Sequence, residues 1–192
     1  MTKTDYYIPL YKNGIYHIYN RGNGNEKLFY EKENYYYFLR QYDKFISELV
    51  DTFAFCLLPN HFHLLVRIKH ANPEIITETF RKFFISYSMS VNKQQQRRGS
   101  LFKRGFKRKL IEDEKYLYAV VYYIQANPVH HGLVDNLTNY NYSSYGILAG
   151  EKETKLKKKT VIDWFGSKEK FIDFHTKSTI KKIDDNFIIE DE

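Results

Sequence analysis

The sequence predicts an α+β fold in which helices pack on one face of an antiparallel sheet, in the ferredoxin-like (split βαβ) arrangement. Three observations lead to this prediction. The expected elements follow the order β-α-β-β-α-β-α, two apolar runs on either side of Pro59-Asn60 are typical of a β-hairpin, and long segments show helical spacing of apolar residues. The second face of such a sheet is free to hold a functional site.

The first half of the chain is expected to form a strand, a helix and a hairpin. Residues 14–20 alternate and run into the turn signal RGNGN, which predicts a strand followed by a loop. Apolar side chains at helical spacing over residues 31–50 predict a helix. Residues 53–58 and 61–68 are the two expected hairpin strands.

The second half adds a helix, a strand and another helix. Residues 73–95 form a helix with Pro73 in its first turn, and residues 101–111 alternate loosely as a basic strand. Residues 113–127 form a helix with acidic residues in its first turn, which Pro128 is expected to stop.

The pattern is weaker after about residue 150. We therefore expect a main domain over residues 1–150 and a C-terminal appendage over residues 151–192, made of a linker and a short helix with the sequence KEKFIDFHTK. A lysine cluster in this region alternates with glutamates and indicates a flexible connection.

Length and composition restrict the possible classes of protein. The 192 residues suit one domain of ordinary size, and 43% hydrophobic with 28% charged residues is typical of a globular chain. Because Cys56 is the one cysteine, an intramolecular disulfide and a multi-cysteine metal site are excluded. No run of 18 apolar residues and no signal-peptide pattern is present, so we expect no membrane partner and a cytoplasmic, nucleoid-associated protein.

The positive charge is concentrated in one segment. Residues 81–110 contain ten basic and no acidic side chains, whereas the rest of the chain has 20 basic against 23 acidic ones. A block of one sign repels itself unless a polyanion is bound, and nucleic acid is the natural partner. A solvated basic surface without a ligand is the alternative.

Two histidines open the second strand of the expected hairpin. His61 and His63 are at i and i+2, so both imidazoles point to the same face of a sheet while Phe62 points to the core. Such a pair can bind one divalent ion. Two partly exposed strand histidines without any metal are the alternative interpretation.

A tyrosine and an asparagine share a face of the last helix. Tyr123 and Asn127 are at i and i+4, one turn apart, and Asn127 is expected at the helix end because it precedes Pro128. A phenol can act as a nucleophile, and a nearby cation provides the activation that its pKa of about 10 requires. The alternative is that Tyr123 is one core residue among the 18 tyrosines.

Five segments resemble the single-tyrosine HUH transposases, and specifically the group of REP-associated tyrosine transposases. They occur in the family's order over roughly residues 10 to 150 and read YHIYNRGN (16–23), LPNHFHLLV (58–66), GSLF with FK (99–107), YIQANPV with GLV (123–134) and YNYSSY (140–145). One departure concerns the basic strand, where the family often has a glutamine after the Leu-Phe pair and this chain has Lys103.

The resemblance implies an HUH nuclease core with His61, His63 and Asn127 as ligands of Mg or Mn and Tyr123 as nucleophile. It also implies a transposase that cleaves single-stranded DNA next to a hairpin, forms a covalent 5′-phosphotyrosine and transfers the strand. We expect the substrate to contact the basic block. The candidate residues are Arg21 in the first loop and, within the block, Arg97, Arg98, Lys103, Arg104, Lys107 and Arg108.

Several alternatives stay open at this stage. A hairpin-binding module without cleavage and a metal-dependent nuclease that uses water compete with the transposase. Arg21 contacts a phosphate or base, or else forms a structural salt bridge. The protein is a monomer or a homodimer.

Overall fold

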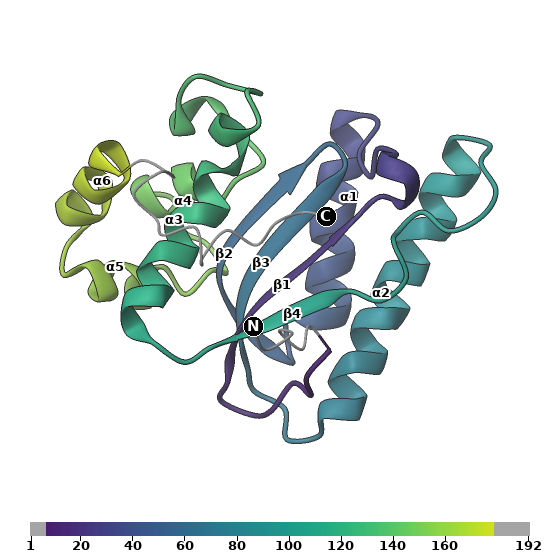
Figure 1. Ribbon diagram of the computed structural model, residues 1–192, viewed down its shortest axis with the longest axis horizontal. Helices are drawn as coiled ribbons and strands as arrows, with labels where there is room; N and C mark the ends of the chain where they lie inside the picture. The colour runs from purple at the N-terminus through teal and green to yellow at the C-terminus, as the bar shows by residue number, and fades with distance from the viewer. Residues whose placement is uncertain (1–6, 179–192) are drawn as a thin grey trace, which may run out of the picture.

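The structure, a computed structural model, describes residues 7–178. Its centre is a four-stranded sheet in the order β2-β3-β1-β4, in which every pair of neighbouring strands is antiparallel (Figure 1). The strands are β1 (Ile15–Arg21), β2 (Val50–Leu58), β3 (His61–Ile68) and β4 (Lys107–Ile111). The predicted α+β class and its antiparallel sheet are confirmed.

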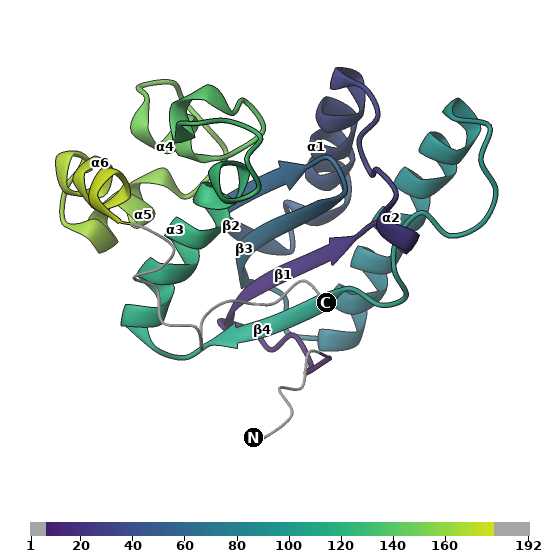
Figure 2. The same ribbon diagram turned by 45° about the horizontal axis from the view of Figure 1, so that its top comes forward.

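One face of the sheet is covered by α1 (Lys32–Ile46) and α2 (Pro73–Gln94), which lie side by side in both views (Figures 1 and 2). Phe38 of α1 and Phe83 of α2 meet Phe62 and Leu64 of β3 in a first hydrophobic core. As predicted, α2 has Pro73 in its first turn. The Asn72 side chain caps this helix by accepting hydrogen bonds from two backbone N–H groups.

The opposite face is partly covered by α3 (Glu114–His130). Val121 and Ile124 of α3 pack on Cys56 of β2 and Leu65 of β3 in a second core. The structure therefore differs in one respect from a sheet with helices on one face, because α3 lies on the face opposite α1 and α2. A helix is thereby placed over the face that was expected to hold the site.

Strand register decides which side chains share this face. In antiparallel pairing, Tyr19 of β1 is opposite His63 of β3, and Arg21 is opposite His61. Side chains alternate along each strand, so Tyr16 and Ile18 enter the first core while His17 and Tyr19 point toward α3.

The basic strand is shorter than the expected 101–111. Only Lys107–Ile111 form β4, and the preceding residues are a loop in which Gly105 has a φ of +74°. The loose alternation over 101–106 arises because Leu101, Phe102 and Phe106 are buried in the first core from this loop. It is therefore a packing pattern and not a strand pattern.

Helix α3 does not stop before Pro128 but continues to His130. Its end is a Schellman motif, in which Gly132 N–H bonds to Val129 O at 3.0 Å and Leu133 N–H to Pro128 O at 2.8 Å. Gly132 has a φ of +65°, which glycine adopts without strain. The glycine, and not the proline, ends this helix.

Two short 3₁₀ turns belong to the connections: η1 (Asn23–Asn25) lies between β1 and α1, and η2 (Leu137–Asn139) follows α3. Three further helices come after η2. These are α4 (Tyr145–Ala149), α5 (Lys158–Phe165) and α6 (Lys168–Lys177). The sequence predicted a linker and one short helix after residue 150. The structure has two helices there, and Val161 of α5 and Phe171 of α6 are buried in the second core with α3.

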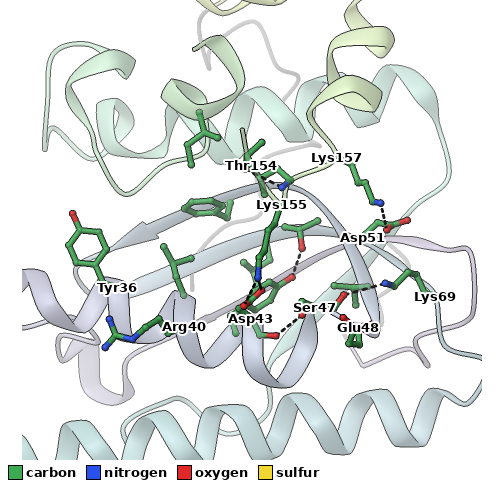
Figure 3. A pocket seen from close by; sticks show the side chains of 18 residues that line it. Tyr36, Arg40, Asp43, Ser47, Glu48, Asp51, Lys69, Thr154, Lys155 and Lys157 are labelled. Atoms are coloured by element: carbon green, nitrogen blue, oxygen red, sulfur yellow. Dashed lines mark hydrogen bonds and ion pairs between the residues drawn. The ribbon is translucent and has the colours of Figure 1, made fainter. Parts of the chain in front are cut away.

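The expected flexible connection is held by ion pairs. Lys155 pairs with Asp43 of α1 at 2.8 Å, and Lys157 pairs with Asp51 of β2 at 3.2 Å (Figure 3). These residues border a cavity of about 760 Å³ between α1, the edge strand β2 and residues 154–157. Among the described residues, no helix combines the length and apolarity that a membrane span requires.

Candidate functional site

His63 lies at the centre of the site and is completely buried. Its Nδ1 is 2.9 Å from Nε2 of His17 on the neighbouring strand. Burial is the main cause that lowers the pKa of both imidazoles, and together with the nearby Lys109 it lowers the pKa of His17 to about 3. Both rings are therefore neutral at physiological pH.

His61 lies beside His63 on the same strand face, with ring centroids 5.1 Å apart and planes nearly perpendicular. Its Nδ1 is 2.8 Å from Oδ1 of Asn60. Because an amide oxygen only accepts, Nδ1 carries the proton and the lone pair is on Nε2. The residue before the first histidine thus fixes the tautomer of the His61 ring.

Helix α3 places Tyr123 and Asn127 over these histidines. The Tyr123 ring centroid is 5.5 Å from that of His63 and 6.1 Å from that of His17. Asn127 is fully buried inside the helix, not at its end, and its amide N–H₂ donates to the Tyr123 carbonyl at 2.8 Å. This bond fixes the direction of the amide oxygen, and the Asn127 amide also acts on the His63 ring by raising its pKa against the larger effect of burial.

Tyr122 faces away from the site. Its hydroxyl donates to the Ser178 carbonyl at 2.8 Å, and its ring packs on Phe174 and His175 of α6. The adjacent tyrosines of α3 are therefore in different surroundings, and only Tyr123 meets the histidines.

The donor set fits a divalent cation. His63 Nε2 and Asn127 Oδ1 are buried and have no hydrogen-bond partner among the described residues, although both atoms belong to groups that rarely stay unsatisfied. Two imidazoles and an amide oxygen suit a cation that also takes phosphate oxygens, as Mg²⁺ and Mn²⁺ do. Within residues 7–178, no three His, Cys, Asp or Glu side chains gather as metal ligands, and an amide oxygen is the third donor beside these two imidazoles.

Basic side chains border the histidines on the same face. Arg21, Lys103 and Lys107 line a small cavity of about 90 Å³ together with Tyr19. A second cavity of about 310 Å³ is lined by Arg21, His61 and three other residues, Asn25, Asn60 and His131. No acidic residue lines either cavity, so both suit the phosphates of a bound strand.

Two predicted nucleic-acid contacts have structural partners instead. Arg97 forms an ion pair with Glu26 and donates to Asn92, and its side chain is only 12% exposed. Arg108 points to the α1/α2 face, where it donates to the carbonyls of Ile8 and Tyr7. Their guanidinium groups hold loops in this structure, and the expected contacts of Arg97 and Arg108 with DNA stay predictions.

The remaining predicted contacts have different positions. Arg98 and Arg104 are exposed in the loop between α2 and β4, and Arg104 lines the 90 Å³ cavity. The first half of the basic block, Arg81, Lys82 and Lys93, is on α2, which covers the other face of the sheet. The charge of residues 81–110 is therefore divided between the two faces.

Three residues near the histidines were not identified from the sequence: His17, Asn60 and His131. His131 follows Asn127 by four residues, and its ring centroid is 4.9 Å from that of His61. This i,i+4 spacing is visible in the sequence, but its use requires that the helix continue past Pro128. The position of His17 depends on the pairing of β1 with β3, which no local pattern specifies.

Known proteins resemble this chain in sequence and in fold. No family model matches the chain. A curated protein of Haemophilus influenzae described as a putative REP-associated tyrosine transposase is 31% identical over 103 residues, which cover 50% of this chain and 58% of that relative. The predicted resemblance to the REP-associated tyrosine transposases is confirmed. At 58%, the match spans less than two thirds of that relative's length.

A solved structure extends the comparison to the fold. It is a REP-associated tyrosine transposase bound to a REP hairpin, with a TM-score of 0.60 and 16% identity, covering 76% of this chain and 84% of that chain. At this identity the likeness shows the fold. The sheet and helices that position the histidines and Tyr123 thus have the architecture of a REP-associated tyrosine transposase.

Proposed function

We propose that this protein is a transposase that cleaves single-stranded DNA and transfers the strand. The Tyr123 hydroxyl attacks a phosphodiester, a bond from Oη to phosphorus forms, and the bond from phosphorus to the 3′-oxygen breaks. The tyrosine loses its proton, the 3′-oxygen gains one, and a 5′-phosphotyrosine with a free 3′-hydroxyl results. A 3′-hydroxyl from another end reverses the step and joins the strands without a nucleotide cofactor.

The observation that carries this proposal is the arrangement of Tyr123 and Asn127 over His61 and His63. In it a phenol and an amide oxygen from α3 meet two imidazoles from β3 at one buried place. His61, His63 and Asn127 would hold a divalent cation, Mg²⁺ or Mn²⁺, which polarises the phosphate and favours the phenolate. All four side chains belong to one chain, which supports a site that is complete in a monomer.

The substrate is proposed from charge and from the relatives. Arg21, Lys103, Arg104 and Lys107 border the site and would hold the phosphates of a single strand. The structural neighbour is bound to a REP hairpin, which supports a hairpin next to the cleaved strand here as well. A transposase with this substrate would act in the cytoplasm, in association with the nucleoid.

The test uses the two adjacent tyrosines as a matched pair. A hairpin oligonucleotide with single-stranded flanks, incubated with the protein and Mn²⁺, is expected to give a protein–DNA adduct on a denaturing gel. Tyr123→Phe removes only the hydroxyl and should abolish the adduct, whereas Tyr122→Phe should retain it and cost about 1 kcal/mol of stability from its lost hydrogen bond.

Each other outcome identifies a competing function. Cleavage without an adduct that survives Tyr123→Phe would indicate a nuclease that uses water. Hairpin binding without any cleavage would indicate a binding module. Mass spectrometry of the trapped peptide locates the nucleotide, and its presence on Tyr122 would contradict the assignment.

A further inference from the structure

We propose that His17 is a positioning residue for His63: it accepts a hydrogen bond from Nδ1–H of His63 and thereby directs the Nε2 lone pair of His63 toward the cation. This inference deepens the proposed function and rests on its assignment of His63 as a ligand. It adds a residue on β1 to a site otherwise built from β3 and α3.

The contact between the two histidines is short and enclosed. His17 Nε2 and His63 Nδ1 are 2.9 Å apart, the ring centroids are 5.1 Å apart, and the planes meet at 30°. Both side chains are fully buried. His17 is two residues before Tyr19, the direct cross-strand partner of His63, so the contact is a diagonal one fixed by the sheet register.

Only one distribution of protons in this pair permits metal binding. A single proton lies between the two nitrogens, and a neutral imidazole has one N–H and one lone pair. If His17 donates, the second proton of the pair is on Nε2 of His63, and that atom has no lone pair for a cation. If His63 donates from Nδ1, its Nε2 is a ligand nitrogen. Metal binding therefore requires His17 as acceptor.

The surroundings keep His17 able to accept. Its ring is fully buried, and its direct cross-strand partner on β4 is the cation Lys109, not an acid that could take the hydrogen bond in its place. Metal-bound histidines usually direct their other N–H to a carboxylate, a backbone carbonyl or water. Here a neutral imidazole takes that place, and no carboxylate is among the groups that shift the pKa of either ring.

Two substitutions separate the acceptor from the bulk of the ring. His17→Phe keeps a flat ring in the buried space but removes the acceptor. His17→Gln places a carbonyl oxygen near the position of Nε2 and restores it. His175→Phe is the matched control, because it replaces a buried histidine in α6 that does not contact the site.

The readout is the affinity of the full chain for Mn²⁺ without DNA, measured by electron paramagnetic resonance of the free ion. We expect His17→Phe to weaken binding by about 10- to 100-fold. We expect His17→Gln to recover it to within a few-fold of the wild type and His175→Phe to leave it unchanged. A folded His17→Phe variant with wild-type affinity would overturn the proposal, as would a loss of affinity shared equally by His17→Gln.

A measurement on the wild-type chain covers the case in which the variants do not fold. In ¹⁵N–¹H spectra of the imidazoles with saturating Mg²⁺, His63 should be the tautomer with the proton on Nδ1. A proton on Nε2 in that state would refute the role of His17. These readouts need no DNA, so they stay informative if the adduct test fails, whereas an adduct with unchanged Mn²⁺ affinity in His17→Phe would refute the inference alone.

Discussion

At the scale of single residues, burial decides the chemistry of the histidines. His61, His63 and His17 are buried on a sheet face covered by α3, and for His63 and His17 this burial disfavours the charged imidazolium. Each ring therefore offers a lone pair, and neighbours such as Asn60 select the nitrogen that offers it. A site built this way loses its function when one ring is removed, even though the surrounding contacts remain.

We predict that His61→Ala or His63→Ala abolishes cleavage but changes hairpin affinity by less than about threefold, since most affinity comes from phosphate contacts elsewhere. Adduct formation on a denaturing gel and fluorescence anisotropy with a labelled hairpin measure the two quantities on the same preparations. Affinity that falls in step with cleavage would show that these histidines support the fold and not the reaction.

The sequence identified those residues of the site that share one element. His61 and His63 are at strand spacing, and Tyr123 and Asn127 are at helical spacing, so each pair was visible as a pattern. His17 was not, because its contact crosses from β1 to β3 and depends on a pairing between segments 46 residues apart. The internal partners of Arg97 and Arg108 were missed for the same reason, since Glu26 and the Tyr7 and Ile8 carbonyls are distant in the chain.

At the scale of elements, β4 and the loop before it present the charge near the site. We predict that the triple variant Lys103→Glu, Arg104→Glu and Lys107→Glu binds single-stranded DNA at least about tenfold more weakly. Its log–log salt slope should be less steep by about 0.7 for each lost phosphate contact. Binding isotherms at several salt concentrations provide both values.

Helix α2 offers a charge-matched control for this experiment. Changing Arg81, Lys82 and Lys93 to glutamate alters the net charge by the same amount as the first triple variant. These residues, however, are on the helix that covers the other face of the sheet. DNA affinity should then stay close to that of the wild type. An equal loss in both triple variants would mean that net charge, and not the site face, attracts the DNA.

His175 on α6 makes the unfolding free energy depend on pH. Its Nδ1–H donates to the Phe171 carbonyl at 2.8 Å, and burial lowers its pKa to about 4. The unfolded state takes up a proton near pH 6.5 and the folded state does not, so stability present above pH 6.5 is lost as the pH falls toward 4. At pH 5 this amounts to about 2 kcal/mol relative to pH 7.

We therefore predict that His175→Phe reduces the loss of unfolding free energy between pH 7 and pH 5 by about 2 kcal/mol. Urea unfolding at both pH values, followed by circular dichroism, measures the difference. The variant still loses stability toward pH 5 through His17 and His63, because burial lowers the pKa of both imidazoles as well. An unchanged pH dependence in the variant would show that His175 is accessible to protons in the folded state.

Periodicity predicted the existence of the main elements better than their ends. The stripe on α1 and the hairpin of β2 and β3 follow from local spacing alone. Pro128, a residue that usually ends a helix, lies inside α3 because Gly132 completes the Schellman motif beyond it. Residues 101–106 imitate a strand because three of their side chains are buried from a loop.

At the scale of the whole molecule, two hydrophobic cores share one sheet. The first joins the sheet to α1 and α2, and the second joins it to α3, α5 and α6. Residue alternation in β2 and β3 connects them, since Phe62 and Leu64 enter the first core while Leu65 enters the second. The C-terminal helices thus support α3 from behind and hold Tyr123 against the histidines.

This arrangement predicts that the chain unfolds in a single transition. Trp164, the one tryptophan, is in α5 with its ring 4.6 Å from that of Phe53 in β2, so its fluorescence reports the second core, whereas far-ultraviolet circular dichroism reports all elements. The two urea curves should coincide.

Phe80→Ala, a first-core variant, and Phe171→Ala, a second-core variant, should each lower the unfolding free energy by about 3–5 kcal/mol. Each should also move both curves together, because a loss in one core destabilises the sheet that the other needs. Two results would show that residues after 150 form a separate unit and that α3 does not depend on them. One is a fluorescence transition that precedes the circular dichroism transition, and the other is a fluorescence midpoint that Phe80→Ala leaves unchanged.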